Sequence, residues 1–470
     1  MIESRSPQRP DDVVVTAPDM GRDEVAAAVR TARQAALAWT NVPAPARARA
    51  LEGVAGAIEA AAAELSDLMV REVGKPLDEA RAEMVRTVAI WRYYAQQGLD
   101  PDGATYPSAD GRSLLMHRRR PHGVAGLITP WNFPAAIPSW KSAPALACGN
   151  AAVLKPAPEA TAMALRLAGC AAPHLPEGLL QVVTGEAGTG QALVGLADVV
   201  SFTGSVAAGR AVARAATEQG VPVQAEMGGQ NASIVLPDAD LEQAAAVVAG
   251  AAMGYAGQKC TATSRAVVVG DPAPFTEALV AAVEALPVGD PAEPANVSGP
   301  VITAEARSVV LGAVQEARSR GGRVLAGGAP AEPGWTVLPT LVDGLDPGDR
   351  LAQEEVFGPL CVVLPAQDAD GAVSIANGVR YGLVTSIFTS DLDRALELMG
   401  RVDTGMVKVN APTSGVDFYA PFGGEKASSL GPREQGKAAR HFYTWTQTIT
   451  LAPSGRGDRP PSAGGTSPRG

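Results

Sequence analysis

Apolar residues recur at helical spacing through the alanine-rich first hundred residues of the chain. Residues 23–39, 46–73 and 77–97 each carry an apolar face opposite a charged one, and this pattern predicts three amphipathic helices. The second helix is expected to end at residues 74–76, where a Gly-Lys-Pro step is a typical stop signal. Residues 1–12 are polar and contain proline, so we expect them to be poorly ordered.

The pattern changes to strand-like alternation at two distant places. Residues 103–121 contain Gly, Pro and Asp-Gly turn signals followed by alternating residues, which predicts a β-hairpin that leaves the domain body. Near the C-terminus, residues 441–451 alternate Phe442, Tyr443 and Trp445 with polar residues and are expected to form another strand. Both pieces are too short to be stable alone, so we expect them to combine.

Between these places, short apolar strands alternate with helices in two successive series. The first series predicts strands at residues 124–128, 151–154, 180–183 and 199–202. The second series predicts strands at residues 232–236, 265–269 and 360–364, with helices at 241–254, 273–285 and 304–320. This rhythm is typical of parallel, doubly wound sheets, and we expect two α/β bodies. Residues 453–470 are rich in Gly, Pro, Ser and Arg, and we expect disorder there.

Length, charge and cysteine content narrow the class of protein. A chain of 470 residues exceeds what one hydrophobic core usually supports, so two or more domains are expected. The net charge of -10 argues against nucleic acid and anionic membranes as main partners. The four cysteines are widely spaced without a CxxC pair, and no apolar leader begins the chain. We therefore expect a cytoplasmic protein that holds no metal.

Three short motifs carry candidate chemistry. Cys260 stands between small polar residues after a Gly-Gln step, Glu226 precedes a glycine pair, and Asn132 lies on a proline-bracketed turn. A thiol nucleophile, a carboxylate base and an amide donor together favour covalent chemistry on a carbonyl group. An isolated cysteine more often packs as a small hydrophobe, and Cys148, Cys170 and Cys361 keep that interpretation.

In this order, the three motifs resemble the aldehyde dehydrogenase family over residues 13–451. The resemblance implies an α/β fold with a Rossmann-type dinucleotide-binding domain, an α/β catalytic domain and a small oligomerisation sheet that completes a homodimer or homotetramer. The implied ranges are 13–102 and 122–228 for the dinucleotide, 229–436 for catalysis, and 103–121 with 437–452 for oligomerisation. Members usually begin with a further strand segment, which is expected to be short or missing here.

The resemblance also assigns roles to the motif residues. Cys260 would attack an aldehyde carbon, while the Asn132 amide and the Cys260 backbone N–H would hold the resulting oxyanion. Glu226 would activate the water that hydrolyses the thioester. Relatives that transfer the acyl group to coenzyme A generally lack a glutamate at this position, so release of the free acid is expected.

Cofactor contacts follow from the same resemblance. The matching positions are Thr129, Trp131, Lys155, Gly204, Ser205, Glu355 and Phe357. Gly204 and Ser205 also stand at a predicted helix N-terminus, where free N–H groups favour phosphate. NAD-preferring relatives commonly carry a glutamate where this chain has Pro158, with Glu159 one residue later. NADP is therefore somewhat favoured, and NAD stays open.

The substrate is suggested by residues 136–141, 259–265 and 412–436, which look most like the branch that oxidises 2-oxoglutarate semialdehyde. The candidate pocket residues are Trp140, Phe133, Thr261 and Phe418. What anchors the anionic end is left open. The alternatives are another small polar or acidic aldehyde, such as succinic semialdehyde, and a non-catalytic dinucleotide-binding or structural protein on the same fold. The intact catalytic motifs argue against the last alternative.

Overall fold

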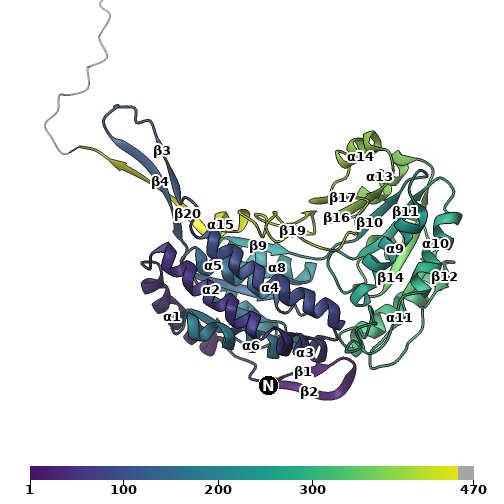
Figure 1. The fold of residues 1–470 in the computed structure, drawn as a ribbon, viewed down its shortest axis with the longest axis horizontal. Helices are drawn as coiled ribbons and strands as arrows, with labels where there is room; N and C mark the ends of the chain where they lie inside the picture. The colour runs from purple at the N-terminus through teal and green to yellow at the C-terminus, as the bar shows by residue number, and fades with distance from the viewer. Residues whose placement is uncertain (454–470) are drawn as a thin grey trace, which may run out of the picture.

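The computed structural model describes residues 1–453. Two α/β bodies lie side by side, and a narrow sheet projects from the first of them (Figure 1). The sequence predicts disorder over residues 453–470. Apart from Pro453, these residues lie outside the described part of the chain. Among residues 1–453, no helix combines the length and apolar character needed to cross a bilayer.

The first body is built on a six-stranded sheet in the order β19-β9-β8-β5-β6-β7. Its strands are β5 (Val124–Thr129), β6 (Ala151–Pro156), β7 (Leu180–Val182), β8 (Val199–Thr203), β9 (Val223–Glu226) and β19 (Ser429–Leu430). All neighbours are parallel except β19, which pairs antiparallel with β9. β5 and β6 are buried at every position, which explains their unbroken apolar sequence. The four strands predicted for this body are confirmed.

Helices cover both faces of this sheet. They are α1 (Arg22–Trp39), α2 (Ala44–Ala60), α3 (Ala62–Val73), α4 (Leu77–Gln97), α5 (Ala136–Ala147), α6 (Thr161–Ala171), α7 (Ala187–Val194) and α8 (Val206–Glu218). α5 packs between the sheet and the α2–α4 pair, whereas α1 packs against α7 and β6. The residues of α5 are all buried, so this helix lies at the centre of the body.

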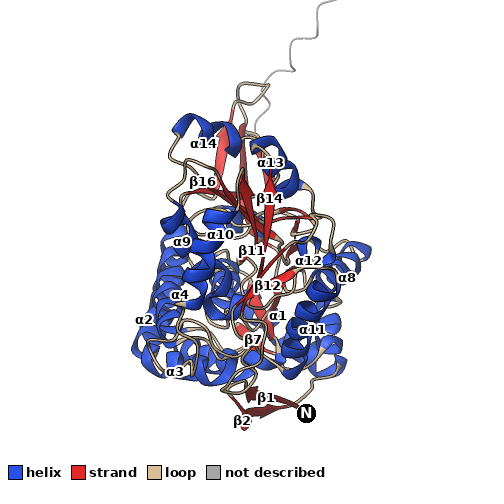
Figure 2. Cartoon of the chain, turned by 90° about the vertical axis from the view of Figure 1, so that its right-hand side faces the viewer, coloured by secondary structure: helices blue, strands red, loops and turns tan. Residues whose placement is uncertain are grey.

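The second body carries a seven-stranded sheet in the order β12-β13-β14-β11-β10-β16-β17. Its strands are β10 (Asn231–Val235), β11 (Thr263–Val269), β12 (Arg323–Ala326), β13 (Thr340–Asp343), β14 (Leu360–Ala366), β16 (Val384–Phe388) and β17 (Met406–Val409). The helices around it include α9 (Leu241–Met253), α10 (Ala273–Glu284), α11 (Ala304–Ser319), α12 (Arg350–Gln353), α13 (Ala369–Asn377) and α14 (Leu392–Met399). Figure 2 shows this sheet edge-on between α9 and α10 on one side and α11 and α12 on the other. The second predicted series of strands and helices is confirmed.

The projecting sheet has the order β20-β4-β3, with β3 (Gly103–Tyr106), β4 (Leu114–Pro121) and β20 (Thr444–Leu451) antiparallel. The hairpin and the C-terminal strand therefore combine as predicted. The strand expected over residues 441–451 begins too early, because α15 (Ala438–Phe442) precedes it. Phe442 and Tyr443 are buried in the first body's core, and only the part of the segment from Thr444 onward is extended.

Two further expectations near the N-terminus are wrong. Residues 1–12 are not poorly ordered, and the N-terminal strand segment is present, as the hairpin β1 (Ile2–Ser6) and β2 (Arg9–Ala17). Its polar residues bond to the body: the Gln8 amide donates to the Val70 carbonyl at 2.8 Å, and Ser4 donates to the Glu159 carbonyl at 3.1 Å. Polarity here reflects long-range hydrogen bonds rather than disorder.

The single helix expected over residues 46–73 is wrong too, because it is divided into α2 and α3. Ala61 leaves helical geometry at φ -94° and ψ 5°. The alanine-rich sequence contains no cap or breaker at this point, so packing of α3 against α4 and α6 sets the break. The return of β19 to the first sheet also lies inside the range predicted for the catalytic domain, and the domain boundaries stay a prediction.

Candidate active site

The loop that carries Cys260 reverses the chain sharply after α9. Tyr255 and Ala256 take positive φ angles of 55° and 52°, and Gly257 follows at 67°. A Cβ at Gly257 would lie 2.3 Å from the Gly358 carbonyl oxygen, so this position requires glycine. The tight loop leaves the Cys260 side chain half-buried, facing the space between the two bodies.

Asn132 is held against this loop from the first body. Its buried amide donates a hydrogen bond to the Gln258 carbonyl at 2.9 Å. The Gln258 side chain is itself fixed, since its Oε1 accepts from the Ile302 N–H at 2.8 Å. The Asn132 amide has a second N–H, and the residue lines a cavity together with Cys260. This placement suits a donor to an oxyanion formed at the thiol.

Glu226 ends β9 and lines a cavity with Cys260. Ser429 donates a hydrogen bond to its Oε2, whereas its buried Oε1 has no hydrogen-bond partner among the described residues. Burial, with the negative charge of Glu434 adding to it, raises the pKa of Glu226 well above the ordinary value. A carboxyl group that is easily protonated and has one open oxygen is suited to exchange protons with water or with the thiol.

The Cys260 thiol is protonated at neutral pH. Burial raises its pKa to about 12, and the nearby carboxylates Glu355 and Glu226 add to this effect. The thiol must therefore lose its proton before it attacks a carbonyl carbon.

A buried polar network stands behind the cavity, and sequence reasoning gave it no role. Glu434 accepts from the Trp140 indole at 2.9 Å and from Ser201 at 3.1 Å, and it forms an ion pair with Lys141. Lys141 also donates to Ser201 at 2.7 Å. The available signal was one carboxylate inside the glycine-bounded segment 431–436. Trp140, expected to line the substrate pocket, is oriented by this network.

Two cavities meet at Cys260. The first has a volume of about 220 Å³ and contains most of the residues expected around the substrate. Its lining includes Phe133, Trp140, Glu226, Thr261 and Phe422. The second has a volume of about 280 Å³ and contains most of the residues expected around the cofactor. Its lining includes Trp131, Asn132, Gly204, Ser205, Glu355 and Phe357.

The second cavity has the features that a dinucleotide requires. Ser205 caps the N-terminus of α8, accepting from the Ala208 N–H at 3.3 Å, so the helix presents its positive end to the cavity. The Thr203 hydroxyl is buried there without a partner among residues 1–453. A Cβ at Gly228 would lie 1.8 Å from a Glu355 oxygen, so glycine leaves room for that carboxylate. Burial raises the pKa of Glu355 to about 7.

Three predicted site residues lie elsewhere. Thr129 ends β5 with a buried hydroxyl that lacks a partner in the described part of the chain. Lys155 lies near the end of β6; burial lowers its pKa, and the negative charge of Glu159 opposes this shift. Phe418 does not line the cavity of Cys260; its ring contacts Tyr93 in a separate groove, with centroids 5.7 Å apart.

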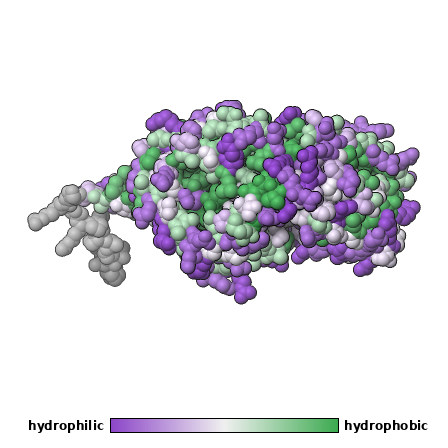
Figure 3. All heavy atoms as spheres, turned by 90° about the horizontal axis from the view of Figure 1, so that it is seen from below, coloured by the Kyte–Doolittle hydropathy of each residue, from purple (hydrophilic) through white to green (hydrophobic). Residues whose placement is uncertain are grey.

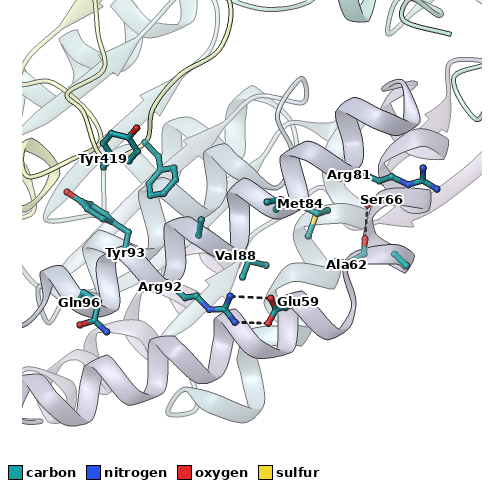
Figure 4. Close-up of a pocket in the computed structure, with 14 residues that line it drawn as sticks. Glu59, Ala62, Ser66, Arg81, Met84, Val88, Arg92, Tyr93, Gln96 and Tyr419 are labelled. Carbon is teal, nitrogen blue, oxygen red and sulfur yellow. Dashed lines mark hydrogen bonds and ion pairs between the residues drawn. The ribbon is translucent and has the colours of Figure 1, made fainter. Parts of the chain in front are cut away.

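That groove is large but holds none of this chemistry. It has a volume of about 870 Å³ and runs between α2, α3, α4 and residues 418–419 (Figure 4). Its lining is mainly apolar, and its charged residues include Arg92, which is paired with Glu59. Neither Cys260 nor Glu226 lines it. The face drawn in Figure 3 likewise shows an apolar area among hydrophilic residues. Residues 1–453 contain no cluster of His, Cys, Asp and Glu side chains suited to a metal ion.

A cysteine loop, an amide donor and a carboxyl group between two α/β bodies form the site of an enzyme suited to covalent chemistry on a carbonyl group. The chain belongs to the aldehyde dehydrogenase family, whose model matches residues 1–449. It is 37% identical to alpha-ketoglutaric semialdehyde dehydrogenase of Bacillus subtilis, covering 96% of this chain and 95% of that protein. It is 39% identical to alpha-ketoglutarate semialdehyde dehydrogenase of Haloferax volcanii, covering 95% of each chain.

The fold is also similar to that of solved structures. The crystal structure of betaine aldehyde dehydrogenase from Staphylococcus aureus in complex with NAD+ superposes with a TM-score of 0.92. The match covers 96% of this chain and 91% of that chain, at 28% sequence identity. The α/β fold expected from the family resemblance is thereby confirmed, and so is the expectation of an aldehyde dehydrogenase.

Proposed function

We propose that this aldehyde dehydrogenase oxidises a small anionic semialdehyde to the free acid, with 2-oxoglutarate semialdehyde as the leading substrate. The observation that carries the proposal is that Cys260 lies where two cavities meet, with Glu226 on the lining of one and Asn132 on the lining of the other. The names of the Bacillus and Haloferax relatives support the choice of aldehyde. Another small acidic or polar aldehyde, such as succinic semialdehyde, is the alternative.

In the proposed reaction, the deprotonated Cys260 sulfur forms a bond to the aldehyde carbon, and the carbonyl oxygen becomes an oxyanion. The Asn132 amide and the Cys260 backbone N–H donate to this oxygen. NAD or NADP, held by the residues of the second cavity, would supply the oxidant by taking up a hydride from the same carbon, and the carbon bonded to Cys260 would then be a thioester. Glu226 then takes a proton from the water that attacks the thioester, which releases the acid and the thiol. The Ser429 hydrogen bond holds this carboxyl group in place.

The proposal assigns the second cavity to the cofactor, with Gly204 and Ser205 at the phosphates and Glu355 at a ribose. Thr129, Trp131, Lys155 and Phe357 complete the assignment. The missing carboxylate at Pro158 favours NADP, whereas Glu159 acts electrostatically on Lys155 and supports NAD. Both coenzymes are therefore included, and a glutamate at position 158 is expected to shift the preference toward NAD.

We further propose how the domains divide the work and where the protein is located. Residues 13–102 and 122–228 bind the dinucleotide, residues 229–436 carry the catalytic cysteine, and the projecting sheet serves assembly of a homodimer or homotetramer in the cytoplasm.

The test is a substrate panel with the purified full-length chain. Semialdehydes of two acids, betaine aldehyde and neutral aldehydes of matched length are each offered with NAD or NADP, and the reduced coenzyme is followed by absorbance. The expected result is the highest kcat/KM for 2-oxoglutarate semialdehyde, with 2-oxoglutarate as product and no turnover in Cys260→Ala. A preference for neutral or cationic aldehydes would contradict the substrate proposal, and turnover in Cys260→Ala would contradict the mechanism.

A further inference from the structure

The wall of the substrate cavity formed by α4 carries a stripe of charged residues. Glu79, Glu83 and Arg86 follow one another at helical spacing, and all three line the cavity that contains Cys260. Charged side chains on the inner face of a helix are costly to bury unless each has a partner. Their pairing therefore indicates which charge is available to a ligand.

Both carboxylates in this stripe are neutralised by lysines. Glu79 accepts from Lys259 Nζ at 2.7 Å. Glu83 forms a buried ion pair with Lys75, and its other oxygen accepts from the N–H groups of Ala135 and Ala136 at 2.9 Å each. Neither carboxylate is thus left to repel an anion.

Arg86 differs from both carboxylates. It is half-buried, and its guanidinium has neither a hydrogen bond nor an ion pair with any of residues 1–453. Glu226, the remaining charged residue of the lining, accepts from Ser429 and forms no ion pair with Arg86. Among the described residues of this lining, Arg86 is therefore the cation that lacks a partner.

A second cation, Lys408, lies near Arg86. Residues 414–416 line the same cavity, and Lys408 donates to the carbonyls of Ser414 and Gly415 at 2.7 Å and 2.6 Å. Burial lowers the pKa of Lys408; the charge of Asp417 opposes this shift, and the nearby positive charge of Arg86 adds to it. Lys408 thus lies near Arg86 without lining the cavity, and the charge of Asp417 acts against the positive charges there.

The distance along α4 suits a short dicarboxylate-like chain. Glu79 contacts Lys259, the neighbour of Cys260, and Arg86 lies seven residues further, which is about 10 Å along a helix. An extended five-carbon semialdehyde spans roughly 5 Å between its terminal carbons, judged from ordinary bond lengths. The long arginine side chain is able to cover the remaining distance.

From this arrangement we propose that Arg86 binds the carboxylate of the substrate and thereby selects anionic semialdehydes. The proposal deepens the proposed function and rests on it. The planar guanidinium donates two parallel hydrogen bonds to a carboxylate, a geometry that a lysine cannot reproduce. The aldehyde end of the bound molecule then lies toward Cys260 and Asn132.

The test compares Arg86→Met with Arg86→Lys and with a matched control. Arg81 lies on the same helix, pairs with Asp78 at the exposed surface and does not line the cavity, so Arg81→Met controls for loss of an α4 arginine. In Arg86→Met, kcat/KM for 2-oxoglutarate semialdehyde is expected to fall about 10- to 100-fold, mainly through KM, because a charge-assisted contact is lost. Pentanal lacks the carboxylate, so its kcat/KM is expected to fall much less than that of the semialdehyde, and Arg86→Lys is expected to lie between wild type and Arg86→Met.

A binding measurement separates this inference from the proposed function. Glutarate, an unreactive dicarboxylate, is titrated calorimetrically into Cys260→Ala and into Cys260→Ala with Arg86→Met. Glutarate binding that requires Arg86 supports the anchor even if the wild type prefers another acidic aldehyde. If wild type and Arg86→Met have equal kcat/KM for anionic semialdehydes, Arg86 does not bind the carboxylate, whereas the proposed function is unaffected. If Arg86→Met loses as much kcat/KM with pentanal as with the semialdehyde, Arg86 has a structural role and the inference is likewise overturned.

Discussion

At the scale of single residues, the protonation of Glu226 decides how the proposed reaction proceeds. The carboxyl group is buried, accepts from Ser429 and has one unpaired oxygen among the described residues. Because burial raises its pKa, this carboxyl group is protonated, and lost as a base, at a higher pH than an exposed glutamate. Hydrolysis of the thioester is therefore the step most sensitive to this residue.

Replacing Glu226 by Gln is expected to leave the first turnover comparatively fast and to slow the steady state by at least about 100-fold. The physical reason is that only the attack of water needs the base once the thiol has reacted. Rapid mixing is the measurement, and a burst of reduced coenzyme followed by a slow phase is the expected trace. An equal loss of burst and steady state would indicate that the residue acts on the thiol instead.

The pH profile gives a second residue-scale prediction. The Ser429 hydrogen bond lowers the pKa of Glu226, in opposition to burial, so Ser429→Ala is expected to raise that pKa further. A general base works when deprotonated, so the steady-state rate rises with pH, and in the variant this rise is expected at higher pH than in wild type. The control is Ser308→Ala on the exposed side of α11, which is expected to leave the profile in place. A shift to lower pH would contradict the account.

At the scale of elements, α4 positions the turn that carries Asn132. Glu83 binds the two N–H groups at the start of α5, and its partner Lys75 lies 3.8 Å from the centre of the Phe133 ring. Both side chains are buried, so each charge depends on the other. Through this contact α4 fixes the N-terminus of α5 and, with it, the preceding residues 130–134.

Glu83→Gln is expected to lower the free energy of unfolding of the first body by about 3 to 5 kcal/mol, because it leaves Lys75 charged and unpaired in the core. Urea denaturation followed by circular dichroism is the measurement. Adding Lys75→Met to this variant is expected to recover much of the loss, since no buried charge then remains. Equal stabilities of the single and double variants would show that the ion pair is not the cause.

At the scale of the whole molecule, the projecting sheet is the feature that points to assembly. Four large apolar residues on its strands are exposed in the single chain: Tyr106, Leu114, Trp445 and Leu451. Apolar side chains on a narrow sheet that extends from the body favour association with another copy. The homodimer or homotetramer expected from the family resemblance stays a prediction, and the projecting sheet is the surface where we expect the contact between copies.

Deleting residues 444–470 is expected to reduce the size of the assembly and its solubility, because it removes β20 and exposes the edge of β4. The cut follows Tyr443, since that residue belongs to the buried core. Deleting residues 456–470 is the matched control and is expected to leave the assembly intact. Light scattering at micromolar concentration measures both, and a monodisperse, active monomer of the full chain would contradict the prediction.

Local sequence patterns were sufficient to predict most helices and strands and to identify the catalytic motifs. The helix predicted over residues 77–97 has the bounds of α4, and the strands of the first series match β5, β6, β7 and β8 closely. Buried strands and amphipathic helices have distinct periodicities, so they can be read within a short window. Cys260, Glu226 and Asn132 were also identified within short motifs, and the structure brings all three to one place.

Contacts between distant segments were decided by the tertiary structure. Glu434 reaches Trp140 across 294 residues, and the polar N-terminal hairpin is ordered by bonds to Val70 and Glu159. The sequence alone suggests that Arg86 is an ordinary surface residue. Only the pairing of Glu79 and Glu83 with lysines identifies Arg86 as the unpaired cation of the cavity lining. The physical reason is that hydrogen bonds and charge pairing depend on which faces meet after folding, whereas periodicity records only whether a face is buried.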